Sequence, residues 1–433
     1  MMKKALKPAL FKFVKFSKKQ LKVLTWWTKK SPVKDKDGII CDGAVRAGKT
    51  VVMALSYVMW AMKTFNEQNF GMAGKTIGAH RRNVITPLKL MLRSRGYKVK
   101  DRRADNYLII TYKGKRNYFY IFGGRDERSQ DLVQGITLAG MFFDEVALMP
   151  QSFVSQAEAR CSVDGAKYWY NCNPESPYHW FKENYIDKKD EKNLIHLHFL
   201  MEDNPSLTAK VIERYKRMFS GVFYKRYILG LWVVAEGIIY EMFDHDKHVV
   251  KRGQKLPSMR RYWVACDYGT SNATTFLLFG LGADGRLYVI DEYYHSGRTE
   301  RKKSPSKYAK DFKEWLSKHK GVMPERIFID PSAEGFILEL YAVLSPRLKS
   351  RIQQADNEVK RGIELVSSII DNDLLRVHER CVNVLKEITA YAWDEKAAER
   401  GEDKPIKAND HTLDPVRYTA NGTRMIWQGK GIA

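Results

Sequence analysis

The feature that most constrains this chain is an eight-residue stretch, Gly43-Ala44-Val45-Arg46-Ala47-Gly48-Lys49-Thr50, which matches the pattern G-x-x-x-x-G-K-[ST] without a mismatch. It follows a short apolar run at 39–41 and precedes another at 51–55, so the order is strand, glycine loop, helix. In such a loop the backbone N–H groups point inward, Lys49 reaches the β- and γ-phosphates, and Thr50 offers its hydroxyl to Mg²⁺. The positive end of the helix dipole favours the same anion. The pattern predicts an ATP site, and the alternative is an ordinary glycine turn before a helix.

A second stretch, 138–145, is an apolar strand that ends in two carboxylates, Asp144 and Glu145. We expect Asp144 to hold Mg²⁺ together with Thr50, and Glu145 to orient and deprotonate the attacking water. An acidic pair after a strand is by itself usually the start of a loop. Downstream of a phosphate loop it indicates ATP hydrolysis.

Other polar residues are candidates for contacts with the γ-phosphate. Arg125 and Arg128 follow the strand at 117–122, and Arg46 lies inside the phosphate loop, so three guanidinium groups compete for the role of arginine finger. The alternative for each is an arginine in a salt bridge or facing DNA. Asn173 follows the strand at 168–172 and is predicted to sense the γ-phosphate, unless it is only a turn residue before Pro174.

Composition bounds the class of protein. The 433 residues favour two or three domains, and the formal charge of +24 indicates a polyanionic partner, unless the charge serves only solubility. The five cysteines are far apart and lack metal-ligand spacing, as expected for buried thiols in a reducing cytoplasm. No apolar run is long enough for a transmembrane helix or a signal peptide, so we expect no membrane partner.

The order of apolar and polar segments predicts four regions. Residues 1–37 are lysine-rich and fit a basic amphipathic helix, whose partner the sequence does not identify. Residues 38–240 alternate strands and helices, which predicts a mainly parallel sheet covered on both faces. Within it we expect a strand at 76–79, a helix at 81–92 and a hairpin at 107–112 and 117–122. Residues 241–257 are interpreted as a linker, and 258–433 as a second domain.

Carboxylates in the second domain stand at the ends of predicted elements. Asp267 ends a strand, and strands at 274–281 and 286–291 complete a meander of the kind with which a ribonuclease H-like nuclease begins. Asp330 ends another strand, and His411 and Asp414 share one face of a helical turn. The three aspartates can converge on Mg²⁺ or Mn²⁺, which phosphodiester cleavage requires, and His411 could ligate the metal or assist proton transfer. Each acid taken alone is more often a surface or turn residue.

Taken together, these motifs closely resemble the large terminase subunit of tailed bacteriophages and prophages, most of all the branch found in phages of Gram-positive bacteria. The resemblance is carried by the phosphate loop and by the stretches 124–127, 144–150 and 170–174, with Asp267, Asp330 and the His411-x-x-Asp414 pair. It implies an α/β fold with an N-terminal P-loop ATPase that drives double-stranded DNA into a procapsid. It also implies a C-terminal ribonuclease H-like nuclease that cuts concatemeric DNA.

The resemblance also implies site residues and partners. Gly43 to Thr50 would form the nucleotide loop, Asp144 and Glu145 the magnesium and hydrolytic acids, and Asn173 the coupling element, while Asp267, Asp330, Asp414 and His411 would form the nuclease centre. The expected partners are a small terminase subunit, the portal protein and further copies in a ring, in the cytoplasm of the infected bacterium and outside the mature virion. Two alternatives stay open: a helicase-like DNA-translocating ATPase whose C-terminal domain binds DNA without cutting it, and an integrase- or resolvase-like nuclease with a regulatory ATPase.

Overall fold

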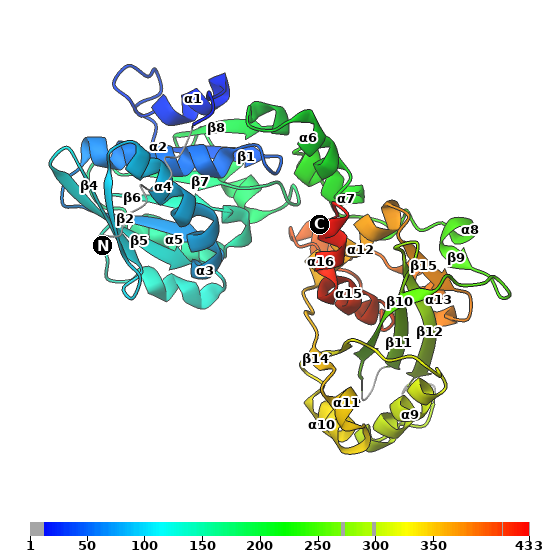
Figure 1. Ribbon diagram of the computed structural model, residues 1–433. Helices are drawn as coiled ribbons and strands as arrows, with labels where there is room; N and C mark the ends of the chain where they lie inside the picture. Colours follow the sequence, from blue (N-terminus) through cyan, green and yellow to red (C-terminus); the bar gives the residue numbers. More distant parts are fainter. Residues whose placement is uncertain (1–12, 270–272, 297–299, 409, 433) are drawn as a thin grey trace, which may run out of the picture. The chain divides into compact units, whose positions relative to one another are not determined.

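The computed structural model describes residues 13–269, 273–296, 300–408 and 410–432 (Figure 1). The chain forms two compact units. The first contains the described residues up to Ile212 together with Lys225–Val234, and the second contains Glu213–Tyr224 and the described residues from Ala235 onward. The region interpreted as a linker, 241–257, contains α8 (His245–His248) and β9 (Val249–Val250), and β9 pairs with a strand of the second unit.

The first unit is built on an eight-stranded sheet with the strand order β3-β4-β5-β2-β6-β7-β1-β8. Neighbouring strands from β5 to β8 are parallel, and only the β3-β4 and β4-β5 pairs are antiparallel. This confirms the predicted mainly parallel sheet. The strands are β1 (Gly38–Gly43), β2 (Asn69–Gly74), β3 (Lys98–Arg102), β4 (Tyr107–Tyr112), β5 (Lys115–Gly123), β6 (Gly140–Asp144), β7 (Lys167–Asn171) and β8 (Leu194–Phe199).

Helices cover both faces of this sheet, and the alternation of side chains along each strand shows why. In β1, Ile39 and Cys41 pack into one apolar core, whereas Ile40 packs into another. Successive residues of a strand point to opposite faces, so a strand with apolar residues on both faces must be covered on both sides. The helices of this unit are α1 (Lys18–Thr25), α2 (Lys49–Thr64), α3 (Ile77–His80), α4 (Thr86–Ser94) and α5 (Gln151–Ala159). The next helix, α6 (Ala209–Lys216), crosses the boundary between the units, and α7 (Gly221–Phe223) belongs to the second unit.

The prediction of a strand at 76–79 is wrong. The second strand along the chain is β2, which ends at Gly74, and Thr76 instead begins a helix. The Thr76 hydroxyl accepts a hydrogen bond from the backbone N–H of Ala79 at 3.2 Å, which is the role of a helix N-cap. The segment 81–92 is helical as predicted, with a π-helical turn at Arg81–Ile85 ahead of α4. The predicted hairpin is also confirmed, as β4 and β5.

The second unit is built on a seven-stranded sheet with the order β14-β13-β10-β11-β12-β15-β9. The central meander of β10 (Met259–Asp267), β11 (Ala273–Gly282) and β12 (Leu287–Ser296) is antiparallel, as the sequence predicts. The remaining strands, β13 (Ile327–Ile329), β14 (Ile352–Gln354), β15 (Leu375–His378) and β9, pair in parallel. Both units are therefore mixed α/β structures with sheets rich in parallel pairs.

Helices pack on both sides of the second sheet. Phe276 of β11 stacks on Tyr293 of β12 with ring centroids 4.5 Å apart, and beneath α9 it meets Phe312 edge to face. The helix α15 packs against β10, β11 and β13. The helices are α9 (Pro305–Ser317), α10 (Glu334–Val343), α11 (Pro346–Lys349), α12 (Val359–Asp371), α13 (Val382–Ala390), α14 (Glu395–Glu399), α15 (Leu413–Gly422) and α16 (Arg424–Gly429).

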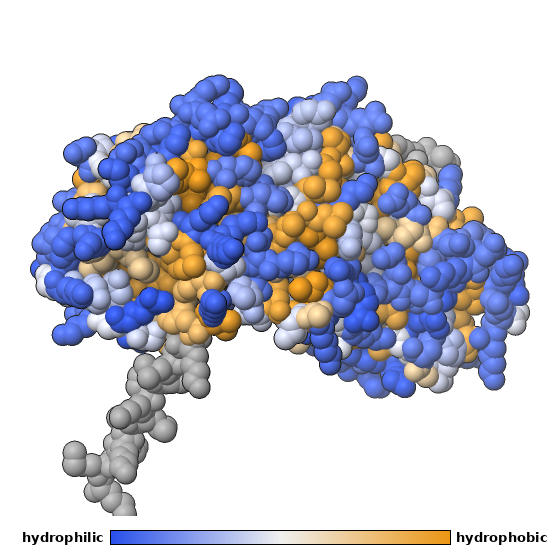
Figure 2. Space-filling model, turned by 90° about the horizontal axis from the view of Figure 1, so that it is seen from above, coloured by the Kyte–Doolittle hydropathy of each residue, from blue (hydrophilic) through white to orange (hydrophobic). Residues whose placement is uncertain are grey.

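The surface is mainly hydrophilic, as expected for a chain in which 29% of the residues are charged. Hydrophilic residues make up most of the face seen in Figure 2, with smaller patches of apolar residues between them. Among the described residues, no helix combines the length and the apolar character that a membrane span requires.

Candidate nucleotide and acidic sites

The phosphate loop connects the end of β1 to the start of α2, and its backbone requires glycine. Gly43 and Gly48 have φ values of 120° and 83°, in the region that glycine adopts most readily. A Cβ atom at Gly43 would lie 2.0 Å from the carbonyl oxygen of Phe199 on β8, so a side chain has no room there. Arg46 also has a positive φ, 58°, and its side chain is exposed. The loop therefore turns as the motif predicts.

Lys49 is buried at the base of this loop. Its ammonium group donates hydrogen bonds to the carbonyl oxygens of Gly43 at 2.9 Å and Ala44 at 2.7 Å, and to Oδ1 of Asn173 at 3.1 Å. Burial lowers the pKa of Lys49 to about 8, against the effect of the neighbouring acids and thiols. The structure thus brings Asn173, which follows the end of β7, into direct contact with the lysine of the phosphate loop.

Thr50 and Asp144 meet on the other side of the loop. The Thr50 hydroxyl donates to Oδ1 of Asp144 at 3.0 Å, and the carboxylate is almost completely buried at the end of β6. Burial, reinforced by the neighbouring Glu145, raises the pKa of Asp144 to about 7. A hydroxyl and a carboxylate at hydrogen-bond distance supply the hard oxygen atoms that Mg²⁺ prefers. These two residues fit a magnesium ion.

Asn171 completes this cluster and was missed from the sequence. Its Nδ2 donates to Oγ1 of Thr50 at 2.9 Å and also to Oδ1 of Asp144. Because β6 and β7 are parallel neighbours, with Asp144 and Asn171 in register, their last residues face each other at the same edge of the sheet. The sequence signal for Asn171 was an amide side chain at the end of the strand that follows β6, the strand that ends in Asp144.

Glu145 and the candidate arginines are exposed. Glu145 adopts the left-handed conformation with φ of 61°, and its pKa is raised by partial desolvation even though the side chain reaches solvent. Arg125 lies in the loop after β5, and Arg128 lies in the short 3₁₀ helix that follows. Because all three arginines are exposed, their positions do not single out one as the arginine finger.

A second group missed from the sequence surrounds Asp42, the residue before the phosphate loop. Its buried carboxylate contacts His196 Nε2 at 2.8 Å and His198 Nδ1 at 3.0 Å through Oδ1, and it accepts a hydrogen bond from Trp232 Nε1 at 2.7 Å through Oδ2. Burial alone would raise the pKa of Asp42, but the hydrogen bonds from these three side chains outweigh it and hold the pKa well below its usual range. The signal was a charged residue inside an otherwise apolar strand, with two histidines spaced to share one face of β8.

In the second unit, the predicted acids gather at one edge of the sheet. Asp267 is the last residue of β10, and Asp330 directly follows β13. These strands are parallel with Cys266 in register with Ile329, so the two aspartates occupy equivalent places at neighbouring strand ends. Asp414 lies in the first turn of α15, which packs against both strands. The fold therefore brings all three acids to the same region.

Hydrogen bonds link this region to His411. Its Nδ1 lies 3.2 Å from Oδ2 of Asp267, and its carbonyl oxygen accepts from the Thr275 hydroxyl at 2.8 Å. The contact with Asp267 raises the pKa of His411. Two residues that the sequence did not single out also contribute: Tyr418 donates its hydroxyl to Asp330 at 3.0 Å, and Arg417 forms an ion pair with Asp414.

The three acids have different electrostatic surroundings. Burial raises the pKa of Asp414 to about 7, with Arg417 opposing and Asp267 reinforcing the shift. Burial also raises the pKa of Asp267. For Asp330 burial acts in the same direction, but hydrogen bonds from Ser332, Asn357 and Tyr418 outweigh it and lower the pKa.

A metal ion at this second group needs a rearrangement of side chains. Within the described residues, no three His, Cys, Asp or Glu side chains are gathered closely enough to hold an ion. Asp414 is instead paired with Arg417, and Asp330 accepts hydrogen bonds from Ser332, Asn357 and Tyr418. The donor atoms are carboxylate oxygens, which suit Mg²⁺ and Mn²⁺ chemically, but their present arrangement does not form a three-ligand site.

Comparisons with known proteins address the identity of the chain. The family described as terminase large subunit, T4likevirus-type, N-terminal, matches residues 40–246. The large terminase subunit of Escherichia phage T5 is 24% identical over 308 residues, which cover 67% of this chain and 66% of that protein, just under two thirds of its length.

Solved structures extend the similarity to nearly the whole chain. The large terminase of a thermophilic bacteriophage is 60% identical, with a TM-score of 0.88, and the match covers 95% of this chain and 100% of that one. The same thermophilic phage protein in complex with ADP is 60% identical with a TM-score of 0.85, covering 95% and 100%. Its complex with ATP-γ-S is 59% identical with a TM-score of 0.84, covering 94% and 99%. The chain therefore belongs to the family of phage large terminases.

Proposed function

We propose that this chain hydrolyses ATP in its first unit to drive double-stranded DNA into a procapsid, and that its second unit cuts concatemeric DNA with the help of Mg²⁺ or Mn²⁺. One observation carries the first part: Lys49 bonds the carbonyl groups of a phosphate loop and Thr50 bonds Asp144 beside it, in a chain that is 60% identical to a terminase solved with ADP. The second part is supported by the shared location of Asp267, Asp330 and Asp414.

In the ATPase reaction, the residues of the loop have separate tasks. The backbone N–H groups from Gly43 to Thr50 would cradle the phosphates, and Lys49 would exchange its carbonyl acceptors for phosphate oxygens. Thr50 and Asp144 would hold Mg²⁺, which neutralises charge on the phosphates. Glu145 would take a proton from the attacking water, and an exposed arginine, from Arg46, Arg125 or Arg128, would stabilise the transition state.

Asn173 offers a route from hydrolysis to motion. Its Oδ1 accepts a hydrogen bond from Lys49 at 3.1 Å, so the position of Lys49 directly affects the end of β7. When Lys49 turns toward a phosphate this bond is lost, and it can form again once the phosphate has gone. The hydrogen bond between Lys49 and Asn173 would therefore be formed in one state of the nucleotide and broken in the other. Through it, Asn173 would transmit that state to the segment that follows β7.

In the nuclease reaction, the acids at the sheet edge would hold the metal and His411 would move a proton. The antiparallel meander β10-β11-β12 followed by the parallel strand β13 is the sheet pattern expected of a ribonuclease H-like domain. Formation of the site requires Asp414 to exchange Arg417 for the ion. The ion would activate water and stabilise the leaving oxygen of the phosphodiester.

The partners and the boundaries follow from the same proposal. We assign ATPase activity to 38–240 and nuclease activity to 258–433, with 241–257 between them and 1–37 as a basic extension. The formal charge of +24 suits contacts with DNA phosphates, which would be indifferent to sequence and weakened by salt. The small terminase subunit, the portal protein and a ring of further copies would act with this chain in the cytoplasm of the infected bacterium, and the chain would be absent from the mature virion.

The ATPase part is tested by Glu145→Gln, with Glu191→Gln as a control at an exposed glutamate ahead of β8, whose first residue pairs with Gly38 at the end of β1 opposite to the phosphate loop. Glu145→Gln should bind ATP as the parent does but hydrolyse it at least about a hundredfold more slowly, because the proton acceptor is lost. It should abolish packaging of DNA into procapsids and leave DNA cleavage intact. Unchanged hydrolysis in Glu145→Gln would refute its assigned role.

A further inference from the structure

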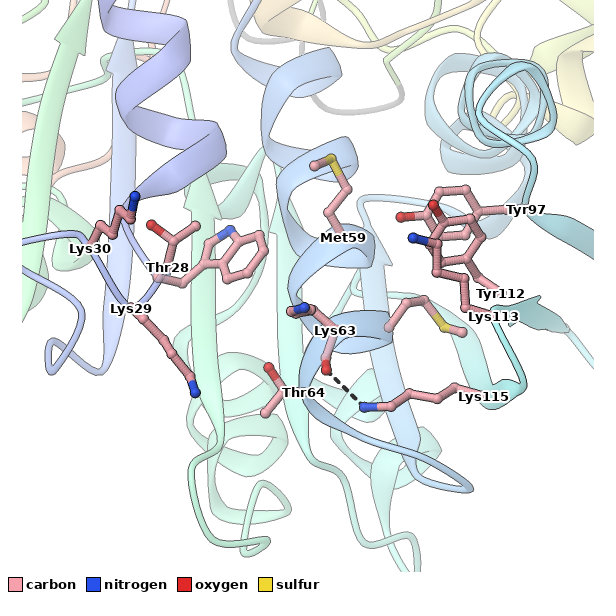
Figure 3. A pocket seen from close by; sticks show the side chains of 12 residues that line it. Thr28, Lys29, Lys30, Met59, Lys63, Thr64, Tyr97, Tyr112, Lys113 and Lys115 are labelled. Atoms are coloured by element: carbon pink, nitrogen blue, oxygen red, sulfur yellow. Dashed lines mark hydrogen bonds between the residues drawn. The ribbon is translucent and has the colours of Figure 1, made fainter.

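A pocket of about 950 Å³ lies in the first unit, away from the phosphate loop. It is formed by the segment after α1, the last turns of α2, Tyr97 ahead of β3 and the turn between β4 and β5. Five lysines line it: Lys29, Lys30, Lys63, Lys113 and Lys115. Figure 3 shows Lys29 and Lys30 on one side of the pocket, Lys113 and Lys115 on the other, and Lys63 between them. The pocket is therefore surrounded by positive charge.

This charge is not balanced locally. The residues that line the pocket include no aspartate or glutamate, and none of the five lysines forms an ion pair with a carboxylate of the described residues. Lys115 donates to the carbonyl oxygen of Lys63 at 2.8 Å, and the Lys113 ammonium lies 5.4 Å from the centre of the Tyr112 ring. Both contacts keep a cation in place without neutralising it. The surroundings favour a negatively charged occupant.

The floor of the pocket is apolar. Met59 and Met62 come from α2, and Tyr97 and Tyr112 stack on each other with ring centroids 4.0 Å apart. Trp27 is fixed by a hydrogen bond from its Nε1 to the hydroxyl of Ser56 at 3.2 Å. Methionine side chains adapt to different apolar partners, and fixed aromatic rings offer contact area at little cost in entropy. A ligand that offers only phosphate groups would make no contact with this apolar floor. A ligand that also carries apolar side chains would bury it.

The chain itself does not supply a matching occupant. Residues 1–12 carry four lysines and no acid, so their charge is repelled by the pocket. A second copy brings a formal charge of +24, so it is a poor match for this pocket, whichever surfaces join the copies in the proposed ring. We propose that this pocket binds an acidic segment of another protein, in which carboxylates contact the five lysines and apolar side chains cover Met59 and the tyrosine pair. This inference does not depend on the proposed function. The pocket is lined by the last turns of α2, whereas the phosphate loop precedes the first turn of the same helix, so the two sites lie at opposite ends of α2.

The test uses fluorescence anisotropy with a labelled peptide in which glutamate alternates with leucine and phenylalanine. Two comparison peptides replace glutamate by glutamine or the apolar residues by alanine. The pocket variant is Lys30→Glu/Lys63→Glu/Lys113→Glu. The control variant, Lys100→Glu/Lys188→Glu/Lys210→Glu, changes the net charge equally at lysines of the same unit that lie outside the pocket. Thermal melting of each variant establishes that it is folded.

The proposal predicts that the acidic apolar peptide binds the parent and the control with affinities within about twofold, and the pocket variant at least about tenfold more weakly, because a few residues carry most of the binding energy. Both comparison peptides should also bind about tenfold more weakly. An equal loss in the two triple variants would show that only net charge matters, and would overturn the proposal. So would a short DNA duplex that loses affinity for the pocket variant while the peptide does not bind the parent, because the pocket would then be a nucleic-acid site.

Discussion

Asp42 should be one of the most sensitive positions in the first unit. Its carboxylate is 1% exposed and joins three parts of the chain: the end of β1, the two histidines of β8, and Trp232 in the segment Lys225–Val234. The same segment accepts a hydrogen bond from the phosphate loop, from the N–H of Val45 to the carbonyl oxygen of Tyr227 at 2.8 Å. The substitution Asp42→Asn removes the charge with almost no change in volume.

The expected loss can be estimated from the three contacts. The asparagine oxygen can still face His196 and His198, but the amide group then points at the Trp232 N–H, so that hydrogen bond, about 1.5–3 kcal/mol to a charged acceptor, is lost. Without the charge, the two histidine contacts weaken by roughly half, about 1 kcal/mol each. Together these give about 3.5–5 kcal/mol. At about 2–4 °C per kcal/mol for a unit of this size, melting should fall by roughly 7–20 °C.

Thermal melting of Asp42→Asn is compared with that of Asp35→Asn, whose side chain is 87% exposed. The control should melt within about 1 °C of the parent, since exposed ion pairs contribute little. ATP hydrolysis should fall in Asp42→Asn, because Asp42 adjoins Gly43. A melting temperature within about 2 °C of the parent for Asp42→Asn would refute the assigned role of this carboxylate.

The pH dependence of the same variant follows from the lowered pKa. A carboxylate whose pKa is lower in the folded state than in the unfolded chain stabilises the fold above the unfolded value, about 3.9, and loses that contribution as the pH falls. The difference in melting temperature between the parent and Asp42→Asn should therefore be full at about pH 6–7 and shrink below about pH 4. A difference that grows on acidification would contradict this sign.

Three further predictions concern other parts of the chain. Gly43→Ala should fold poorly or melt at least about 5 °C lower, because its Cβ would meet the Phe199 carbonyl oxygen at 2.0 Å; a melting curve like that of the parent would show that the loop adjusts. Arg417→Met should lower the free energy of unfolding in urea by about 1–3 kcal/mol, because the partly buried Asp414 loses its partner and, with a pKa already near 7, takes up a proton; the double variant Arg417→Met/Asp414→Leu should recover part of the loss. Binding of duplex DNA should weaken steeply between about 50 and 200 mM salt; anisotropy that shows no salt dependence would exclude an interface dominated by phosphate contacts.

Much of the fold could be predicted from the sequence because its patterns are local. The glycine loop, the apolar run that ends at Asp144, and the meander that begins with Asp267 each carry their own signal, and the structure confirms the strands that they predict. The strand expected at 76–79 failed because Thr76 caps a helix, a choice made by one hydroxyl and one N–H rather than by hydrophobicity. β-Branched residues such as Thr76 and Ile77 favour strands only on average.

The site residues that could not be identified from the sequence depend on contacts between distant segments. Asp42 and Trp232 are 190 positions apart, and Asn171 reaches Thr50 across 121 positions. No periodicity in a single sequence encodes such pairs. The ion pair between Arg417 and Asp414 is different, because its partners stand three residues apart on α15 and a helical reading of 411–418 could have found it. That pair engages one of the three acids, Asp414, which would have to leave Arg417 to bind a metal ion.

The central claim is that one chain carries two separate catalytic centres, and Asp267→Ala tests it most directly. ATP hydrolysis and metal-dependent linearisation of plasmid DNA are measured side by side for the parent, for Asp267→Ala and for Asp246→Ala, a control at an exposed acid of the second unit. We expect Asp267→Ala to lose cleavage by at least about a hundredfold and to keep its ATPase rate, with the control unchanged in both. Cleavage that survives in Asp267→Ala, or a parent that hydrolyses ATP but cuts no DNA with either metal, would contradict the account and favour a helicase-like motor.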